Sequence, residues 1–409
     1  PKVAGYDLEL FLDMAWDIDC VSGATINDHY RRWLCQQFGP QVGKQLFPAM
    51  HEFFRLCGER HPEFMGWNQV EVSKSAYDRG LSQVRNTEFS QTEFGNELDG
   101  YLNRFAAVAA QVRAAKRSLR PELRDAFFAA IEYPVYAADA HARKMLWAQK
   151  ARQLANGSTQ KGMFDHQAEL YHACAESQQA YQKIRSLTEY YNEKMAGGKW
   201  RRSMNMPPRD LPVFGAPVLP TLLTDAQVKE WLEKGRKALG NKANNNTANT
   251  DSNILTTAKP TSGVIARNAA DWQQASPGTQ IVEMLGHSMK AVALPQNGKV
   301  SYTFSTDKTG DYVLRLALIP TQPNDRGDLR FSVSIDGAQP TVYSLKEKFR
   351  SEQWKLNVLR GQALRELPLK GLQTGQHTLT ICALDPHVVL DQWMVDNKAN
   401  RSFYLFPVK

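Results

Sequence analysis

The densest gathering of aromatic and cationic side chains lies between residues 187 and 202. A helix-like stretch ends at Tyr190 and Tyr191, two glycines follow, and Lys199, Trp200 and Arg201 come directly after them. Aromatic rings offer apolar faces and Lys or Arg binds carboxylates, so this cluster can bind an acidic sugar. A second interpretation stays open, in which the glycines only cap the helix and Trp200 packs against the next segment.

Three tryptophans, Trp272, Trp354 and Trp393, occur in the last third of the chain. Together they can form a carbohydrate platform, whereas a tryptophan in a β-sandwich is more often part of the core. The candidate carbohydrate contacts of the whole chain are Tyr190, Tyr191, Lys199, Trp200, Arg201 and Trp354.

Catalytic motifs are absent from the sequence. It contains no GxGxxG, P-loop, HExxH or GxSxG pattern, and its helical histidines lack the spacing of metal ligands. His166 and His172, for example, are six residues apart and would lie on different helix faces. A glycosidase needs two carboxylates about 5 to 9.5 Å apart, and spacing alone singles out no such pair. We therefore predict no catalytic residue, no metal site and no cofactor.

Length and composition bound the class of protein. The 409 residues are 42% hydrophobic and 22% charged, which suits two or three folded domains. No apolar run approaches the ~18 residues that span a bilayer, so no membrane association is expected. Five widely spaced cysteines without a CxxC pattern predict buried free thiols and leave the compartment undecided.

The net charge of +8 invites a nucleic-acid interpretation. The densest basic run, from Arg113 to Arg124, spans the end of one expected helix and the start of the next. Both a solvated helix face and an anion-binding surface fit this run. No helix-turn-helix, zinc-finger or RNP-type pattern accompanies it, so no nucleic-acid partner is predicted.

The first 239 residues have helical periodicity, which predicts a helical bundle. Leu98, Leu102, Phe105, Ala109 and Val112 form one apolar stripe. Further helices are expected over residues 8–16, 28–38, 127–138, with a kink at Pro134, and 170–191. A Pro-rich strap over 203–223 and a last helix over 224–239 complete this domain.

A flexible linker over 240–259 and a β-sandwich over 260–409 are expected next. The Asn-rich linker has no apolar periodicity. Beyond it the period becomes two, which predicts an antiparallel, jelly-roll-like sandwich. The expected strands are Val300 to Phe304, Tyr312 to Ile319, Phe331 to Ile335, His377 to Cys382 and Ser402 to Phe406, with a turn at Asp336-Gly337.

Several of these stretches together resemble the C-terminal half of the glycoside hydrolase family 115 xylan α-1,2-glucuronidases. The resemblance keeps its order along nearly the whole chain. The matching residues are Leu10 to Trp16, Arg60-His61-Pro62-Glu63, Arg124 to Phe128, Tyr133-Pro134-Val135, Leu187 to Trp200, Trp272, Leu285-Gly286-His287-Ser288 and Gly375 to Asp391.

The resemblance implies the helical bundle and C-terminal sandwich of an enzyme that removes 4-O-methylglucuronic acid from glucuronoxylan or aldouronic acids. It places the catalytic carboxylates in a barrel domain outside this chain, so none is transferred to these residues. It also implies a homodimer and favours a bacterial periplasmic or extracellular location. The chain departs from the family over Ser203 to Phe214, where relatives carry a paired Met and an aromatic-rich segment.

Two alternatives remain open. The chain can be a non-catalytic carbohydrate-binding or scaffolding protein that uses Trp354, Trp393 or the cluster from Tyr190 to Trp200. Its basic charge can instead serve nucleic acid, with an affinity that falls steeply with salt. If the isolated chain were active, Glu189 and Asp210 would be the first candidates for its chemistry.

Overall fold

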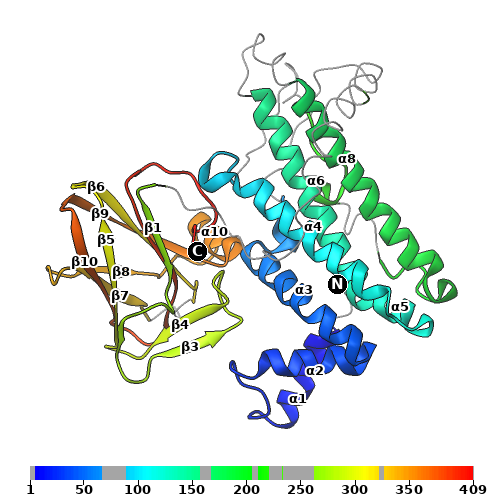
Figure 1. Cartoon of the computed structure of the whole chain (residues 1–409), viewed down its shortest axis with the longest axis horizontal. Coiled ribbons are helices and arrows are strands. Elements are labelled where there is room, and N and C mark those ends of the chain that lie inside the picture. The colour runs from blue at the N-terminus through cyan, green and yellow to red at the C-terminus, as the bar shows by residue number, and fades with distance from the viewer. Residues whose placement is uncertain are drawn as a thin grey trace.

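The computed structural model describes residues 5–66, 89–156, 167–204, 211–220, 233, 262–321 and 327–408. The expected linker over 240–259 lies outside them, as does the expected helix over 224–239 apart from residue 233. A helical domain is followed by two antiparallel sheets that form a β-sandwich, which confirms the predicted fold class (Figure 1). In the described part of the chain, no helix is both long and apolar enough to cross a membrane.

Helices build this domain, and the longer ones pack along one another (Figure 1). They are α1 (Gly5–Trp16), α2 (Ile26–Phe38), α3 (Pro40–Glu59), α4 (Glu97–Lys116), α5 (Arg124–Phe127), α6 (Tyr133–Asn156) and α8 (Gln167–Glu189). The predicted stripe of α4 is buried, with Leu98, Phe105 and Val112 at most 1% exposed. Asn96 caps this helix, because its Oδ1 accepts a hydrogen bond from the Asp99 N–H at 3.0 Å.

The kink expected at Pro134 takes the form of a π-helical turn over Phe128–Glu132, between α5 and α6. Proline has no N–H for a bond to the carbonyl four residues earlier, so the regular ladder is interrupted there. Phe127, directly before this turn, and Ile131 on it are at most 1% exposed. The kink therefore keeps the apolar side chains of this segment in the core.

A strap over residues 211–220 runs along the helices and is held by buried cations. The Lys144 ammonium on α6 donates hydrogen bonds to the carbonyls of Val213 at 2.8 Å and Gly215 at 2.9 Å. Burial lowers the pKa of Lys144 to about 8. The Lys144 side chain thus supplies hydrogen bonds to strap carbonyls that have no secondary-structure partner.

The sandwich consists of two sheets with the strand orders β3-β4-β11-β6-β9, with β1 also paired to β11, and β2-β5-β10-β7-β8. The first sheet contains β1 (Val264–Asn268), β3 (Gln280–Glu283), β4 (Lys290–Leu294), β6 (Gly310–Leu318), β9 (Ala363–Leu372) and β11 (Val388–Asp396). The second contains β2 (Gln274–Ala275), β5 (Lys299–Thr306), β7 (Arg330–Ile335), β8 (Thr341–Ser344) and β10 (Gly375–Ala383). A short helix, α10 (Glu352–Arg360), joins β8 to β9.

The central strand β11 is buried along its whole length. Its Trp393 side chain is 1% exposed and packs between the sheets beside Tyr302 and Phe304, at ring-centroid distances of 5.3 and 5.9 Å. Its Met394 belongs instead to the hydrophobic core of the helical domain. One sheet therefore serves two cores, with its inner face in the sandwich and its outer face against the helices.

The strand expected over Ser402 to Phe406 was wrong. Residues 401–408 form no strand, and Tyr404, Leu405 and Phe406 join the hydrophobic core of the helical domain. The N–H of Leu405 donates to the Glu97 carboxylate of α4 at 2.8 Å, and the N–H of Tyr404 does so at 2.9 and 3.0 Å. A buried carboxylate thus takes the place of a neighbouring strand.

A row of alternating charges crosses the junction between the two domains. Arg315 of β6 is 1% exposed and contacts Asp396 of β11 at 2.6 Å. Asp396 also pairs with Arg401 at 2.7 Å, and Arg401 pairs with Glu93 of the helical domain. Because each charge is neutralised by its neighbours, the row can be buried without an uncompensated ion.

Burial raises the pKa of Glu97 to about 7, although N–H groups of Ser90, Leu405 and Tyr404 bond to its carboxylate. The carboxyl group of Glu97 therefore holds its proton more tightly in the folded protein than in the unfolded chain, where the pKa of this group is near 4.5. By linkage, the free energy of unfolding falls as pH rises from about 4.5 to about 7, by at most about 3 kcal/mol from this group.

We predict that Glu97→Gln removes this contribution, because an amide does not ionise. Urea denaturation between pH 4.5 and 8 should show a flatter pH dependence for the variant, and a lower stability since the amide N–H₂ faces backbone donors. The control is Glu122→Gln, whose side chain is 61% exposed. An unchanged slope in Glu97→Gln would contradict the assignment.

Candidate functional site

Among the described residues, no group of three or more His, Cys, Asp and Glu side chains is arranged to hold a metal. His141 is half-buried with its Nε2 3.1 Å from the Met65 carbonyl oxygen, and burial lowers its pKa to about 4. It is therefore a neutral, hydrogen-bonded histidine. Of the two carboxylates considered for chemistry, Glu189 is exposed and Asp210 lies outside the described residues.

The segment after α8 continues the helix with two irregular turns. A π turn over Tyr190–Lys194 leads into a 3-10 turn over Met195–Gly198. Gly197 and Gly198 have φ values of 64° and 81°, which glycine adopts without strain. The side chain of Asn192 fixes the return of the chain, because it accepts from the Met204 N–H at 2.9 Å and donates to the Met204 carbonyl at 2.8 Å.

This segment presents two of its three aromatic rings to solvent. Tyr190 is 40% exposed and packs edge-on against Phe128 at 4.6 Å, and Trp200 is 43% exposed. Tyr191 is only 3% exposed and belongs to a core cluster with Leu187. Its ring is not available to a sugar, which corrects its place among the candidate contacts.

Cations accompany the exposed rings. The Lys199 ammonium lies 5.2 Å from the centroid of the Trp200 ring. Arg201 pairs with Glu193 at 3.3 Å, with both side chains exposed. Tyr190, Trp200 and Lys199 are therefore the exposed side chains of this segment that remain candidates for carbohydrate contact. We call these three residues the helix-end cluster.

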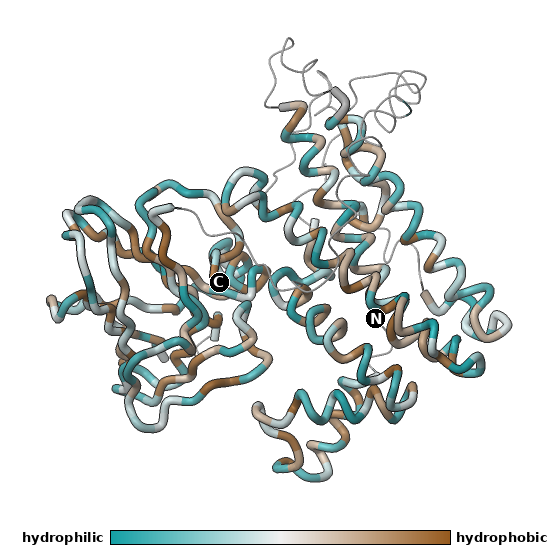
Figure 2. Tube along the Cα trace, viewed as in Figure 1, coloured by the Kyte–Doolittle hydropathy of each residue, from teal (hydrophilic) through white to brown (hydrophobic). Residues whose placement is uncertain are grey.

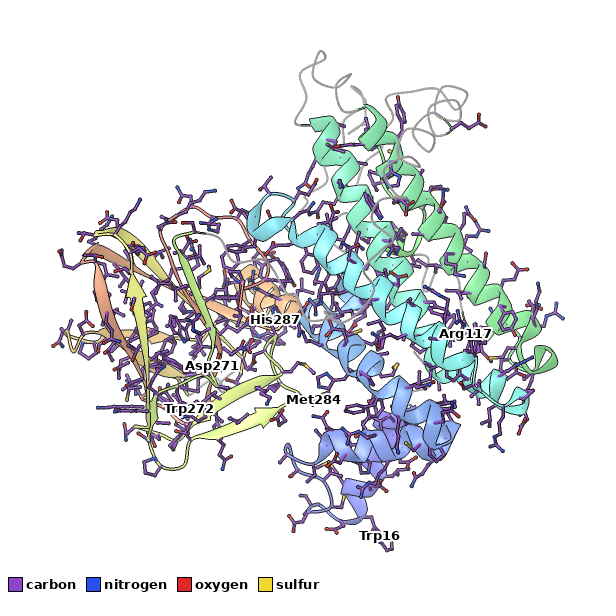
Figure 3. All side chains as sticks on the ribbon, viewed as in Figure 1. Trp16, Arg117, Asp271, Trp272, Met284 and His287 are labelled. Atoms are coloured by element: carbon purple, nitrogen blue, oxygen red, sulfur yellow. The ribbon has the colours of Figure 1, made fainter. Side chains whose placement is uncertain are left out.

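The tryptophans of the sandwich do not form a common platform. Trp393 is in the core, and Trp272 packs on the edge of the same core (Figure 3). Trp354 lies on α10 and contacts Phe349, with ring centroids 5.1 Å apart. Of these three tryptophans, only Trp354 remains a candidate carbohydrate contact.

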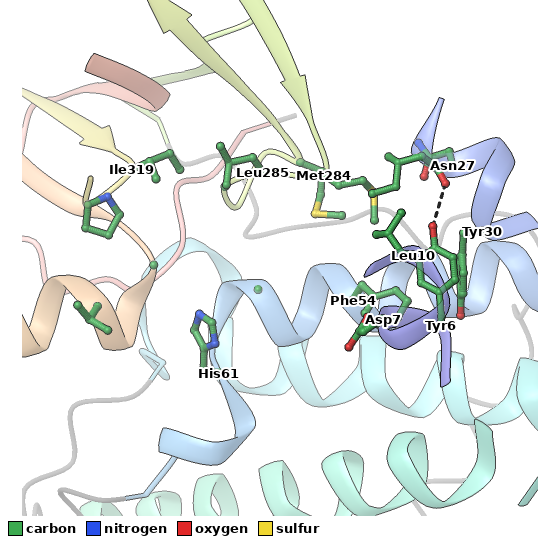
Figure 4. Close-up of a pocket in the computed structure, with 17 residues that line it drawn as sticks. Tyr6, Asp7, Leu10, Asn27, Tyr30, Phe54, His61, Met284, Leu285 and Ile319 are labelled. Atoms are coloured by element: carbon green, nitrogen blue, oxygen red, sulfur yellow. Dashed lines mark hydrogen bonds between the residues drawn. The ribbon is translucent and has the colours of Figure 1, made fainter. Parts of the chain in front are cut away.

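A cavity of about 590 Å³ lies between the helical domain and the sandwich (Figure 4). Tyr6, Leu10 and His61 line it from the helices, and Met284 and Met289 line it from the sandwich. The Tyr6 hydroxyl donates to the Ile26 carbonyl at 3.4 Å, and burial raises its pKa to about 12. This mostly apolar lining suits a hydrophobic side chain or the face of a sugar ring.

Asp391 organises the sandwich loop beside this cavity. Its carboxylate is fully buried and accepts hydrogen bonds from the N–H groups of His287 at 2.8 Å and Ser288 at 3.1 Å, and from Gln362 at 2.6 Å. A Cβ at Gly286 would come within 2.3 Å of the same carboxylate. Glycine is therefore required where the loop crosses Asp391.

Two further residues tie the loop region to the helices. The Arg60 guanidinium at the end of α3 donates to the Leu359 carbonyl of α10 at 3.2 Å. The Nε2 of His287 lies 2.7 Å from the Arg360 carbonyl oxygen, and its imidazole stacks on Tyr404. Burial lowers the pKa of His287, so it acts as a neutral hydrogen-bonding group.

Sequence reasoning found these residues without finding their role. Arg60, Gly286, His287 and Asp391 all lie in stretches that carry the family resemblance. Asp391 and His287 are 104 positions apart, so no local pattern connects them. Only the resemblance marked them.

Two family models match the chain. Residues 260–409 match the glycosyl hydrolase family 115 C-terminal domain, and residues 1–64 match glycosyl hydrolase family 115. No curated protein matches the sequence.

Solved structures also resemble the chain. A family GH115 4-O-methyl-α-glucuronidase with specificity for decorated arabinogalactans is 30% identical, with a TM-score of 0.72 over 96% of this chain and 44% of that chain. This chain thus spans less than half of that relative. A C-terminal CBM6 of a laminarinase from Zobellia galactanivorans covers 33% of this chain and 99% of its own at 10% identity and a TM-score of 0.26. A family 35 carbohydrate-binding module from Clostridium thermocellum covers 32% and 98% at 12% identity and a TM-score of 0.25.

We predict that Asp391→Ala destabilises the protein by about 3 kcal/mol, because it leaves several buried donors without an acceptor. Denaturant unfolding followed by tryptophan fluorescence measures the change. Asp311→Asn is the control, since the Asp311 side chain is 60% exposed and its pair with Lys370 lies at the surface. Equal stability of Asp391→Ala and the wild type would refute the anchoring role.

Proposed function

Because the chain belongs to glycoside hydrolase family 115 and corresponds to the C-terminal portion of its members, we propose that it is part of an α-glucuronidase that acts on a decorated polysaccharide. The product is 4-O-methylglucuronic acid. One observation carries the proposal: both ends of the chain match models of this family, and 96% of the chain superposes on a family GH115 4-O-methyl-α-glucuronidase.

The proposed role of the chain is to support the catalytic barrel. Helix α1 has no buried residue, and its Leu8, Phe11 and Leu12 are 59%, 66% and 55% exposed. Trp16 at its end is 93% exposed and points away from the rest of the chain (Figure 3). The trace of α1 includes hydrophobic positions (Figure 2). An apolar face of this size is typical of a covered surface, and we propose that the barrel covers it.

The substrate class follows from the relatives. Glucuronoxylan and aldouronic acids are the substrates that the family resemblance suggests, whereas the solved relative has specificity for decorated arabinogalactans. Their shared group is 4-O-methylglucuronic acid, and we propose this as the unit removed. Assays of the full-length protein on glucuronoxylan and on glucuronate-decorated arabinogalactan separate the two polymers. A homodimer is proposed as well, and light scattering of the full-length protein tests it.

A second candidate function is carbohydrate binding without catalysis. The observation that favours it is the helix-end cluster, in which Tyr190 and Trp200 are 40% and 43% exposed beside Lys199. Exposed aromatic rings beside a cation fit a sugar that carries a carboxylate. This function is compatible with the first one, because the same surface can hold the polymer for the full-length enzyme.

We predict that the isolated 409-residue chain releases no uronic acid from aldouronic acids, because we place the acid and the base in the barrel. Product analysis after overnight incubation measures this, with the full-length protein as the positive control. Turnover that a single substitution such as Glu189→Gln abolished would contradict the placement. Inactivity of the full-length protein on every uronate-bearing polymer would refute the proposed function itself.

We also predict that Trp200→Ala weakens binding of the isolated chain to glucuronoxylan by about fivefold, since one stacked aromatic ring is worth on the order of 1 kcal/mol. Affinity gel electrophoresis measures the change. Trp16→Ala is a matched control, because it removes another exposed tryptophan, one that lies on the proposed barrel contact. The same loss of binding in both variants would count against the helix-end cluster.

A further inference from the structure

The loop before α10 carries a second pair of aromatic rings that neither core uses. Phe349 is 66% exposed, and Trp354 lies against it with an angle of 72° between the rings. The Ser351 hydroxyl accepts from the Trp354 N–H at 3.2 Å and starts the helix there. The pair is therefore held in place at its base and open to solvent at Phe349.

The backbone of this loop is strained beside the pair. Arg350 has a φ of 59°, a left-handed conformation that side chains other than glycine rarely adopt. This conformation places the Arg350 guanidinium 5.3 Å from the centroid of the Phe349 ring. Strain of this kind persists where the surroundings enforce it, and ligand-binding surfaces are common places for it.

The loop also carries positive charge that no carboxylate of the described residues neutralises. Glu347 pairs with Arg365 at 2.9 Å, and Glu352 contacts Lys355 at 2.7 Å. Lys348 and Arg350 are exposed, and neither forms an ion pair with a carboxylate in the described part of the chain. Two free cations therefore flank an exposed aromatic ring, which complements a ligand with both an apolar face and a negative charge.

We propose that Lys348, Phe349, Arg350 and Trp354 form a binding surface for a uronate-bearing polysaccharide. A sugar ring stacks on Phe349, and its carboxylate or that of a neighbouring unit binds Lys348 and Arg350. The choice of a uronate rests on the proposed function, whereas the surface itself rests on the loop. It is separate from the helix-end cluster, which lies on the other domain.

The position of α10 connects this surface to the rest of the protein. Its far end contacts the helical domain through the bond from Arg60 to the Leu359 carbonyl at 3.2 Å. Val358 and Gly361 at that end line the interdomain cavity. The surface is thus fixed in orientation relative to both domains, and a bound polymer would be held at a constant distance from the helical domain.

The test uses the isolated chain with Trp200→Ala as background, so that the helix-end cluster does not mask the result. Titration calorimetry with aldouronic acids, with neutral xylo-oligosaccharides of equal length and with glucuronate-decorated galactan oligosaccharides gives three affinities. We expect Phe349→Ala to weaken both acidic ligands at least fivefold. The Lys348→Ala/Arg350→Ala double variant should lose the preference for acidic over neutral ligands. Melting temperatures establish that each variant is folded.

Val342→Ala is the matched control, because Val342 is an apolar residue of the same domain that is 57% exposed on β8. It should bind like the background. Equal affinity of Phe349→Ala and the background, or equal affinity for acidic and neutral ligands, would overturn the proposal. The activity assay on the full-length protein keeps the two proposals apart: an inactive enzyme whose Phe349 surface binds uronates refutes the proposed function alone.

Discussion

The structure depends on a single buried carboxylate that holds the end of the chain. Glu97 at the start of α4 accepts the backbone N–H groups of Tyr404 and Leu405, which would otherwise be buried without partners. This interaction lets the C-terminal segment enter the core of the helical domain instead of extending a sheet. Because the same segment leaves β11 at Asp396, the sandwich is connected to the helices by its central strand rather than by an edge. The helices and the outer face of the sandwich consequently share one hydrophobic core, apart from the core between the two sheets.

A buried ion cluster lies at the junction, in which one arginine pairs with two glutamates. The Arg104 guanidinium binds Glu59 at 2.7 Å and Glu52 at 2.6 Å, and Glu59 offers its carbonyl to the Tyr404 hydroxyl at 3.1 Å. Replacing one partner of such a network leaves a buried ion without its counterion. This lowers stability far more than replacing the whole network by apolar residues. The junction therefore favours one relative orientation of the two domains. This rigidity suits the proposed support of a separate catalytic domain.

Local periodicity predicted the elements that pack against neighbours of the same kind. The stripe of α4 and the alternation of β5, β6, β7 and β10 are examples. The method failed for Ser402 to Phe406, where alternating apolar residues serve a helical core and a distant glutamate supplies the acceptor. Tyr191 lies four residues after Leu187, so helical spacing places both side chains on one buried face, which the aromatic cluster alone did not indicate. No pattern within a short window encodes the contact of the C-terminal segment with Glu97.

How far each candidate surface could be predicted depends on how close its residues are in the sequence. Tyr190, Lys199 and Trp200 are close in sequence, so the helix-end cluster could be recognised before the fold was known. The anchor of the cavity could not. Asp391 meets Gly286 and His287 through the pairing of β11 with β4, and it meets Gln362 through the separate pairings of β11 with β6 and of β6 with β9. The surface around Phe349 lies between these cases. Its residues are adjacent, but its significance depends on exposure, on the strained Arg350 and on charges left without acidic partners, and only the folded chain determines these properties.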